Sequence, residues 1–260
     1  MTADNESVGP SDVFSISTWR VERWARLGST NDRARELAVA GHPGRQWIIA
    51  DEQTAGRGRL GRTWNSPTGN LYASALLIDP CSIELGAQIG FVAGVSILRA
   101  VRDLGATEAR LKWPNDLLVD GAKLAGLLVE GLTTPARRFA AIVGIGVNVG
   151  HSPEVPAYPT THLHALVQRP VAARQLFERL AIRFDETLAI WAHGAGFATV
   201  RELWLQGAAG LGGPIRVNDS HGAREGVFAG LDASGRLMLR RNETVEIVES
   251  GDLSLILPPA

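Results

Sequence analysis

Hydrophobic and polar residues follow two periods along this chain, and each period predicts one kind of element. From Trp19 they alternate, which is typical of a half-buried strand. Further apolar runs predict strands at residues 46–51, 70–79, 110–112, 117–120, 123–130 and 139–149. Apolar residues at helical spacing predict helices that begin near Thr30, span 85–105, run from Pro170 to Gly194 and span 197–205. The mixture predicts an α+β fold.

Local signals indicate the helix ends and one close packing contact. Thr30 has a hydroxyl group that can cap the first helix, and Gly41 ends it. In the second helix, Gly86, Gly90 and Gly94 recur every four residues and leave one face without side chains. Because each glycine costs a helix about 1 kcal/mol, we expect a close neighbour on that face.

The composition changes along the chain and predicts three regions. Residues 1–13 are polar and are expected to form a disordered tail. A larger domain is predicted over residues 14–208. Residues 207–214 (GAAGLGGP) then lead into short alternating runs that are separated by Asp-Ser-His-Gly and Asp-Ala-Ser-Gly turns. Residues 209–260 are therefore predicted to form a small all-β module.

Composition and charge exclude several classes of protein. With 45% hydrophobic and 20% charged residues the chain is expected to be globular, and its net charge of -1 gives no overall footprint for nucleic acid. The longest uncharged apolar stretch, residues 85–98, is shorter than the ~18 residues of a membrane span. The N-terminus has no signal-peptide pattern, so a cytoplasmic location is expected. The single Cys81 excludes an intramolecular disulfide and a Cys-based zinc site.

A glycine–arginine loop carries the first candidate chemistry. Residues 56–62 (GRGRLGR) match G-x-G-x-x-G, but Pro67 and a strand follow where a Rossmann fold needs a helix, and no kinase triplet accompanies the loop. Arg57, Arg59 and Arg62 present guanidinium groups that can bind carboxylate or phosphate. From these residues alone, a site for a small anion, an RNA-binding patch and a solvated basic loop all stay open.

The distribution of lysine marks a second candidate site. Of 26 basic residues only Lys112 and Lys123 are lysines, and they lie on either side of a predicted hairpin turn at residues 120–121 (DG). A two-residue turn pairs Leu118 with Lys123, which puts Asp116 on the same face as Lys123. The hairpin is expected to place a compact ammonium group close to a carboxylate.

A third candidate segment, residues 144–150 (GIGVNVG), has glycines inside a predicted strand. Such glycines are typical of close approach by a ligand or by another part of the chain. Amide groups near the candidate segments come from Asn31, Gln53, Asn115 and Asn148. No carboxylate pair and no Ser-His-Asp order stands out, so hydrolysis by acid–base catalysis is disfavoured.

Five segments together resemble the biotin protein ligases, also called biotin–[acetyl-CoA-carboxylase] ligases. They are residues 28–31 (GSTN), 51–64 (DEQTAGRGRLGRTW), 112–116 (KWPND), 123–126 (KLAG) and 144–148 (GIGVN). Enzymes of this family join biotin to ATP as biotinyl-5′-AMP and then transfer biotin to a lysine of a biotin carboxyl carrier domain. The resemblance implies biotin and ATP as substrates and Mg²⁺ as a cofactor, without identifying a protein ligand for the metal.

The resemblance also implies roles for single residues. Lys123 is expected to be catalytic together with Arg59, which retains the adenylate. Biotin-binding residues are expected to be Ser29, Thr30, Asn31, Gln53, Gly56, Arg57, Gly58, Arg59 and Lys123. ATP- or adenylate-binding residues are expected to be Arg57, Arg59, Arg62, Trp64, Asn115, Asp116, Lys123, Gly126 and Asn148. Asp116 is also expected to orient the incoming carrier lysine, and the helix glycines are expected to pack near the biotin slot.

For the fold, the resemblance implies a central mixed sheet flanked by helices over residues 14–208, followed by a small C-terminal SH3-like β-barrel. Some family members carry an N-terminal DNA-binding domain. Because 28 residues precede Ser29 here, no binding to operator DNA is expected. The resemblance leaves open lipoate as an alternative substrate and a homodimer as the assembly.

Overall fold

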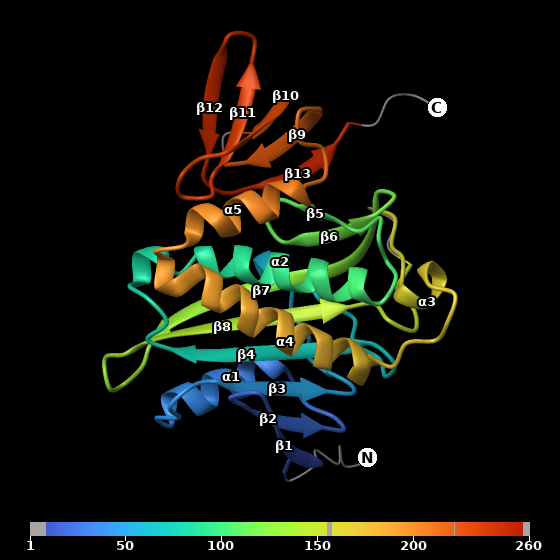
Figure 1. Ribbon diagram of the computed structural model, residues 1–260, viewed down its shortest axis with the longest axis vertical. Helices are drawn as coiled ribbons and strands as arrows, with labels where there is room; N and C mark the ends of the chain where they lie inside the picture. Colours follow the sequence, from blue (N-terminus) through green and yellow to red (C-terminus); the bar gives the residue numbers. More distant parts are fainter. Residues whose placement is uncertain (1–8, 155–157, 221, 257–260) are drawn as a thin grey trace.

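The larger part of the molecule is one mixed sheet, which we describe from a computed structural model covering residues 9–154, 158–220 and 222–256 (Figure 1). Its strands are β1 (Asp12–Ile16), β2 (Trp19–Trp24), β3 (Gln46–Ala50), β4 (Leu71–Ile78), β5 (Arg110–Lys112), β6 (Asp116–Val119), β7 (Ala122–Thr133) and β8 (Phe139–Val147). The order across the sheet is β1-β2-β3-β4-β8-β7-β6-β5. Strands β2 and β3 are parallel, and the other neighbouring pairs are antiparallel. The predicted central mixed sheet is confirmed.

Helices cover both faces of this sheet (Figure 1). They are α1 (Thr30–Val39), α2 (Gln88–Asp103), the short α3 (Leu163–Leu166), α4 (Ala173–Trp191) and α5 (Phe197–Gln206). Single 3₁₀ turns occur at η1 (Arg59–Gly61), η2 (Ile83–Leu85) and η3 (Ala192–Gly194). Helix α4 packs with the sheet through Phe177 and Phe184, whose rings lie edge-on to Trp47 at centroid distances of 5.6 and 5.2 Å. Helix α1 covers the opposite face with Ala34 and Ala38.

Three predicted element boundaries differ from the structure for local reasons. Ser29, not Thr30, caps α1, because Ser29 is extended and its hydroxyl accepts a hydrogen bond from the Asp32 amide at 3.4 Å. Helix α4 begins at Ala173, three residues after Pro170. Strand β1 begins at Asp12, inside the segment predicted to be a tail. Residues 1–8 of that predicted tail lie outside the described residues.

Two of the three glycines at four-residue spacing have the close neighbour that the spacing predicts. A Cβ atom at Gly86 would lie 3.0 Å from Phe139, and one at Gly94 would lie 3.2 Å from Nε1 of Trp204. Gly86 precedes α2, which begins at Gln88. Gly86 and Gly90 line a second cavity of about 440 Å³, and the prediction that these glycines pack near the biotin slot stays a prediction.

The C-terminal region is a second, smaller sheet. Its strands are β9 (Pro214–Asp219), β10 (Gly222–Leu231), β11 (Leu237–Arg241), β12 (Thr244–Val248) and β13 (Asp252–Leu255). They form an antiparallel sheet in the order β12-β11-β10-β9-β13, which is consistent with an SH3-like domain, although its edge strands β12 and β13 are not paired with each other over the described residues. The turn after β10 packs onto the larger domain, where Nε1 of Trp113 donates to the carbonyl of Gly235 at 3.3 Å. One hydrophobic core continues through both regions.

No helix in residues 9–154, 158–220 or 222–256 is long and apolar enough to cross a membrane.

Candidate active site

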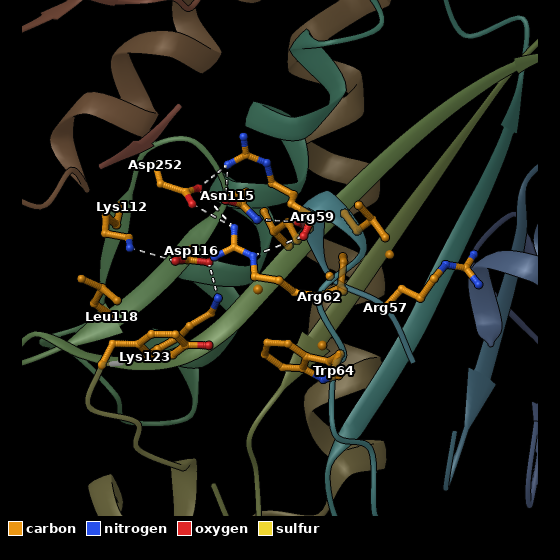
Figure 2. Close-up of a pocket in the computed structure, with 18 of the residues that line it drawn as sticks. Arg57, Arg59, Arg62, Trp64, Lys112, Asn115, Asp116, Leu118, Lys123 and Asp252 are labelled. Carbon is orange, nitrogen blue, oxygen red and sulfur yellow. Dashed lines mark hydrogen bonds and ion pairs between the residues drawn. The ribbon is translucent and has the colours of Figure 1, made fainter. Parts of the chain in front are cut away.

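A cavity of about 580 Å³ opens where the glycine–arginine loop, the β6–β7 hairpin and β8 meet strand β13 of the smaller sheet (Figure 2). It brings together predicted site residues from four separate segments. Those that line it are Ser29, Thr30, Asn31, Gln53, Arg57, Gly58, Arg59, Arg62, Trp64, Asn115, Asp116, Lys123 and Gly126. Two predicted residues, Gly56 and Asn148, are not among its lining residues.

One end of the cavity, which we call the amide end, is formed by Ser29, Thr30, Asn31 and Gln53. Oε1 of Gln53 accepts hydrogen bonds from the backbone amide of Thr30 at 2.8 Å and from its hydroxyl at 3.0 Å. Nε2 of Gln53 donates to the hydroxyl of Ser66 at 3.1 Å. Because both ends of the Gln53 amide are bonded, its orientation is fixed by the protein.

Asn31 is held equally firmly. Its Nδ2 donates to Glu130 at 2.6 Å, and its Oδ1 accepts from the hydroxyl of Ser74 at 2.6 Å. Glu130 in turn pairs with Arg35 at 3.0 Å. A Cβ atom at Gly144 would lie 2.5 Å from Oδ1 of Asn31, so this glycine in β8 leaves the space that the Asn31 amide occupies. The sequence marked residues 144–150 as unusual but gave no signal for this neighbour.

A cross-strand pair of glycines forms the floor beside the amide end. Gly126 of β7 lies opposite Gly146 of β8 in the antiparallel register. The indole ring of Trp64 covers both, because a Cβ atom would lie 3.1 Å from it at Gly126 and 2.6 Å from it at Gly146. The Nε1 atom of Trp64 is buried and has no hydrogen-bond partner among the described residues.

The two predicted residues outside the lining support it from behind. Gly56 accepts a hydrogen bond from the Trp64 amide at 2.9 Å, and a side chain there would meet the Trp64 carbonyl at 2.5 Å. Nδ2 of Asn148 donates to the carbonyl groups of Thr161 at 3.0 Å and Lys123 at 3.4 Å. Gly56 thus lets the loop fold back, and Asn148 fixes the backbone at Lys123.

The other end of the cavity, which we call the charged end, is formed by Lys112, Asp116, Lys123, Arg59 and Arg62 (Figure 2). Nζ of Lys123 lies 2.6 Å from one oxygen of Asp116, and Nζ of Lys112 lies 3.0 Å from the other. The predicted proximity of Asp116 and Lys123 is confirmed. It results from the predicted turn, because Asp120 and Gly121 both have positive φ and Leu118 pairs with Lys123.

The Asp116 carboxyl is only 9% exposed. Burial raises its pKa, but the ammonium groups of Lys123 and Lys112 outweigh burial and hold the pKa below its ordinary value. Asp116 is therefore ionised at neutral pH. The only two lysines of the chain meet on this one carboxylate.

The Lys123 ammonium also lies between two aromatic rings. The centroids of Trp64 and Tyr158 are each 5.4 Å from its Nζ atom. The segment after Tyr158 returns to the hairpin, where the Lys123 amide donates to the carbonyl of Pro159 at 2.8 Å. Sequence reasoning missed Tyr158, since no local pattern indicates that this segment packs against the hairpin.

The three arginines of the loop have different partners. Arg57 points away from the charged end and binds both oxygens of Asp32 at 2.7 and 2.6 Å (Figure 2). The Arg57 hydrogen bonds hold the pKa of Asp32 below its ordinary value. Arg59 donates to Oδ1 of Asn115 at 3.1 Å. Sequence reasoning also missed Asp252 of β13, which pairs with Arg59 at 3.4 Å and with Arg62 at 3.1 Å.

The charge at this end favours an anionic ligand. Four cationic side chains face three carboxylates of the cavity, which are Asp116, Asp120 and Asp252. The amide end, in contrast, offers neutral donors and acceptors. The cavity can therefore hold a molecule with a neutral polar head and an anionic group at its other end.

Comparison with known proteins agrees with this arrangement. The family model of the biotin/lipoate A/B protein ligases matches residues 24–148. The biotin–[acetyl-CoA-carboxylase] ligase of Paracoccus denitrificans is 36% identical over 237 residues, which cover 88% of this chain and 98% of that protein. The bifunctional ligase/repressor BirA of Bacillus subtilis is 30% identical over 237 residues, which cover 88% of this chain and 72% of that protein. This chain belongs to the biotin/lipoate A/B protein ligase family.

A solved structure agrees over the whole fold. The biotin protein ligase of Aquifex aeolicus in complex with biotin and ATP superposes with a TM-score of 0.78 at 28% sequence identity. The match covers 91% of this chain and 98% of that one. Both sheets of the present chain therefore belong to the shared architecture.

Proposed function

We propose that the cavity carries out both steps of a biotin protein ligase reaction. The chain joins biotin to ATP, which forms biotinyl-5′-AMP and pyrophosphate, and then transfers biotin to a lysine of a biotin carboxyl carrier domain. Membership of the family and the similarity to biotin ligases over nearly the whole chain support this activity. One observation supports the assignment of the site above all others. Both lysines pair with Asp116 at one end of a cavity, and the opposite end of that cavity is neutral.

The amide end takes the ureido ring of biotin. This ring is neutral and needs both donors and acceptors in a confined slot, which Ser29, Thr30, Asn31 and Gln53 supply. The valeryl chain follows the glycine floor at Gly126 towards Lys123. This direction brings the biotin carboxylate to the charged end.

Lys123 makes the first step possible by neutralising charge. The biotin carboxylate attacks the α-phosphate of ATP, and two like charges 4 Å apart repel by roughly 4 kcal/mol at an effective dielectric constant of about 20. An ammonium group between them reverses the sign of that interaction and stabilises the charge that develops on the phosphate. Asp116 and the two aromatic rings hold the Lys123 ammonium in place.

In the second step the carrier lysine attacks the biotinyl carbonyl group, and AMP leaves. Asp116 was expected to orient this lysine, but both of its oxygens are paired with lysines of the chain itself. We therefore assign Asp116 to the positioning of Lys123. The role of Arg59 is to bind phosphate oxygen and retain the adenylate.

Magnesium enters with ATP in this scheme. The described residues contain no group of three or more side chains suited to bind a metal, and Asp116 and Asp252 are engaged with cationic side chains. We assign the cation no protein ligand. We further propose that the enzyme acts in the cytoplasm on a carrier domain of a biotin-dependent carboxylase.

Exchange of labelled pyrophosphate into ATP tests this function. Exchange should require biotin, should not respond to lipoate, and should fall by about 100-fold or more in Lys123→Ala, since a single electrostatic group at a reaction centre contributes on this scale. Circular dichroism establishes that the variant is folded. Exchange with lipoate instead of biotin would assign the chain to the other branch of the family, and no exchange in folded wild-type protein with magnesium would contradict the proposal.

A further inference from the structure

A carboxylate of the smaller sheet is paired with the two guanidinium groups that we assign to binding of the ATP phosphates. Oδ2 of Asp252 lies 3.1 Å from Nη2 of Arg62, and Oδ1 lies 3.3 Å from the same nitrogen (Figure 2). The same Oδ1 lies 3.4 Å from Nη1 of Arg59. Arg59 also donates to the carbonyl of Gly251 at 3.4 Å. The smaller sheet thus supplies both acceptors from two adjacent residues.

A carboxylate and a phosphate compete for the same donors. Both present oxygen atoms that accept the parallel N–H groups of a guanidinium, so a donor that is used by Asp252 is not available to a phosphate in the same direction. The two anions also repel one another, because both face the charged end. A phosphate that takes the donors used by Asp252 on Arg59 and Arg62 therefore displaces this carboxylate.

The contacts of Asp252 are suited to exchange. All its distances to the arginines exceed 3.0 Å, and its side chain is 43% exposed. The pair of Arg57 and Asp32 differs, since both oxygens are bound at 2.7 Å or less. The backbone at Asp252 is fixed, because it pairs with Asn218 of β9 and the next residue, Leu253, is buried. Only the Asp252 side chain has to turn for the exchange to occur.

We propose that Asp252 is an internal counter-ion that takes, before ATP binds, the place of a phosphate group on Arg59 and Arg62. It keeps the two guanidinium groups at the mouth of the cavity and opposes ATP binding by competition. The inference rests on the proposed assignment of these arginines to the ATP phosphates. It gives the smaller sheet a direct part in the nucleotide site.

Asp252→Asn tests the competition, because it removes the charge and keeps the shape. ATP binding, measured by calorimetric titration, should tighten by about threefold to tenfold, on the scale of a partly exposed ion pair. The KM for ATP in pyrophosphate exchange should fall by the same factor while biotin affinity stays unchanged. Asp103→Asn is the matched control, since Asp103 pairs with Arg183 on the helical face of the molecule, and it should leave ATP binding unchanged.

A double-mutant cycle separates competition from a structural role. In an Arg62→Gln background the gain from Asp252→Asn should shrink, because one of the contested donors is gone. Unchanged ATP affinity in Asp252→Asn would overturn the inference, and weaker binding would make Asp252 a residue that positions the arginines for phosphate. Calorimetry keeps the two proposals distinct, since tighter ATP binding without any exchange activity would support the counter-ion and contradict the ligase function.

Discussion

The amide end of the cavity and the arginines of its charged end differ in how tightly their side chains are already bonded. At the amide end Ser29, Thr30 and Asn31 are each 4% exposed, and the amide groups are fixed by hydrogen bonds of 2.6 to 3.1 Å. At the charged end, Arg62 and Asp252 are exposed and their contacts are longer. On our proposals, the biotin slot is formed before the ligand arrives, whereas the phosphate site is completed by exchange of partners.

Gly144→Ala should produce the largest effect and should be confined to the amide end. The new Cβ atom would lie 2.5 Å from Oδ1 of Asn31, so the amide must leave its position between Glu130 and Ser74. We expect biotin affinity to fall by about 100-fold, or ~2.7 kcal/mol, because buried polar groups lose their partners. Titration with biotin measures the loss, and ATP affinity should not change.

Gly90→Ala is the matched control for this substitution. Its Cβ atom would meet Val129 at an ordinary contact distance of 3.6 Å. Equal biotin affinity in Gly144→Ala and wild type would show that the amide end adapts to its ligand, and the comparison of the two ends would fail.

Arg59→Ala and Arg57→Ala should have different effects on the KM for ATP. Arg59 faces the charged end, and we expect its removal to raise the KM for ATP by about 30-fold, as for a charged group bound to phosphate. Arg57 is already bound by both oxygens of Asp32 and points away. Its removal should change the KM for ATP by less than about threefold, because it is engaged elsewhere. Steady-state exchange kinetics give both values, and a reversed order would refute the assignment of Arg59.

Lys112→Ala should have a smaller effect at the charged end. Without Lys112, Lys123 alone compensates Asp116, so more of the Lys123 charge is held by the carboxylate and less is available to the reacting anions. We expect kcat for adenylate formation to fall by about tenfold, or ~1.4 kcal/mol. Single-turnover measurements give this rate. Lys112→Arg keeps the charge and should recover part of the lost rate. An equal loss of rate in both variants would indicate a steric cause.

A dependence of stability on pH is expected at Asp116. Its pKa is lower in the folded protein than in the unfolded chain, so its contribution to the free energy of unfolding is present above about pH 4 and is lost as the pH falls below that value. Denaturant unfolding of wild type and Asp116→Asn should differ by about 1 to 3 kcal/mol at pH 7, because the variant leaves two ammonium groups without a carboxylate. The difference should decrease towards pH 3. If the difference in the free energy of unfolding does not change with pH, Asp116 stabilises the protein through its shape and not through its charge.

The β6–β7 hairpin could be predicted from the local sequence, whereas other parts of the site could not. The Asp-Gly turn determines the pairing of Leu118 with Lys123, and a β-bulge between Leu117 and Leu118 then shifts the register before Asp116, whose carboxylate still reaches Lys123. Asp252 and Tyr158 reach the cavity only through the packing of segments that are distant in sequence, which no local pattern encodes. The glycine spacing predicted close contacts that are present at Gly86 and Gly94, but spacing indicates a bare face without indicating what covers it.

The same reasoning explains the smaller errors. Ser29 and Thr30 are equally good capping residues, and only the backbone conformation decides between them. Strand β1 was missed because its pattern is largely exposed and it has one neighbour, β2, in the sheet.

The position of Trp64 on the paired glycines gives the protein an optical reporter. The other six tryptophans are each at most 7% exposed and lie in the core, where a ligand in this cavity does not change their surroundings. Trp64 alone lines the cavity, and its indole N–H has no partner among the described residues. Occupation of the site therefore changes the polarity around one emitting ring out of seven. Intrinsic fluorescence can follow ligand arrival in real time without any attached dye.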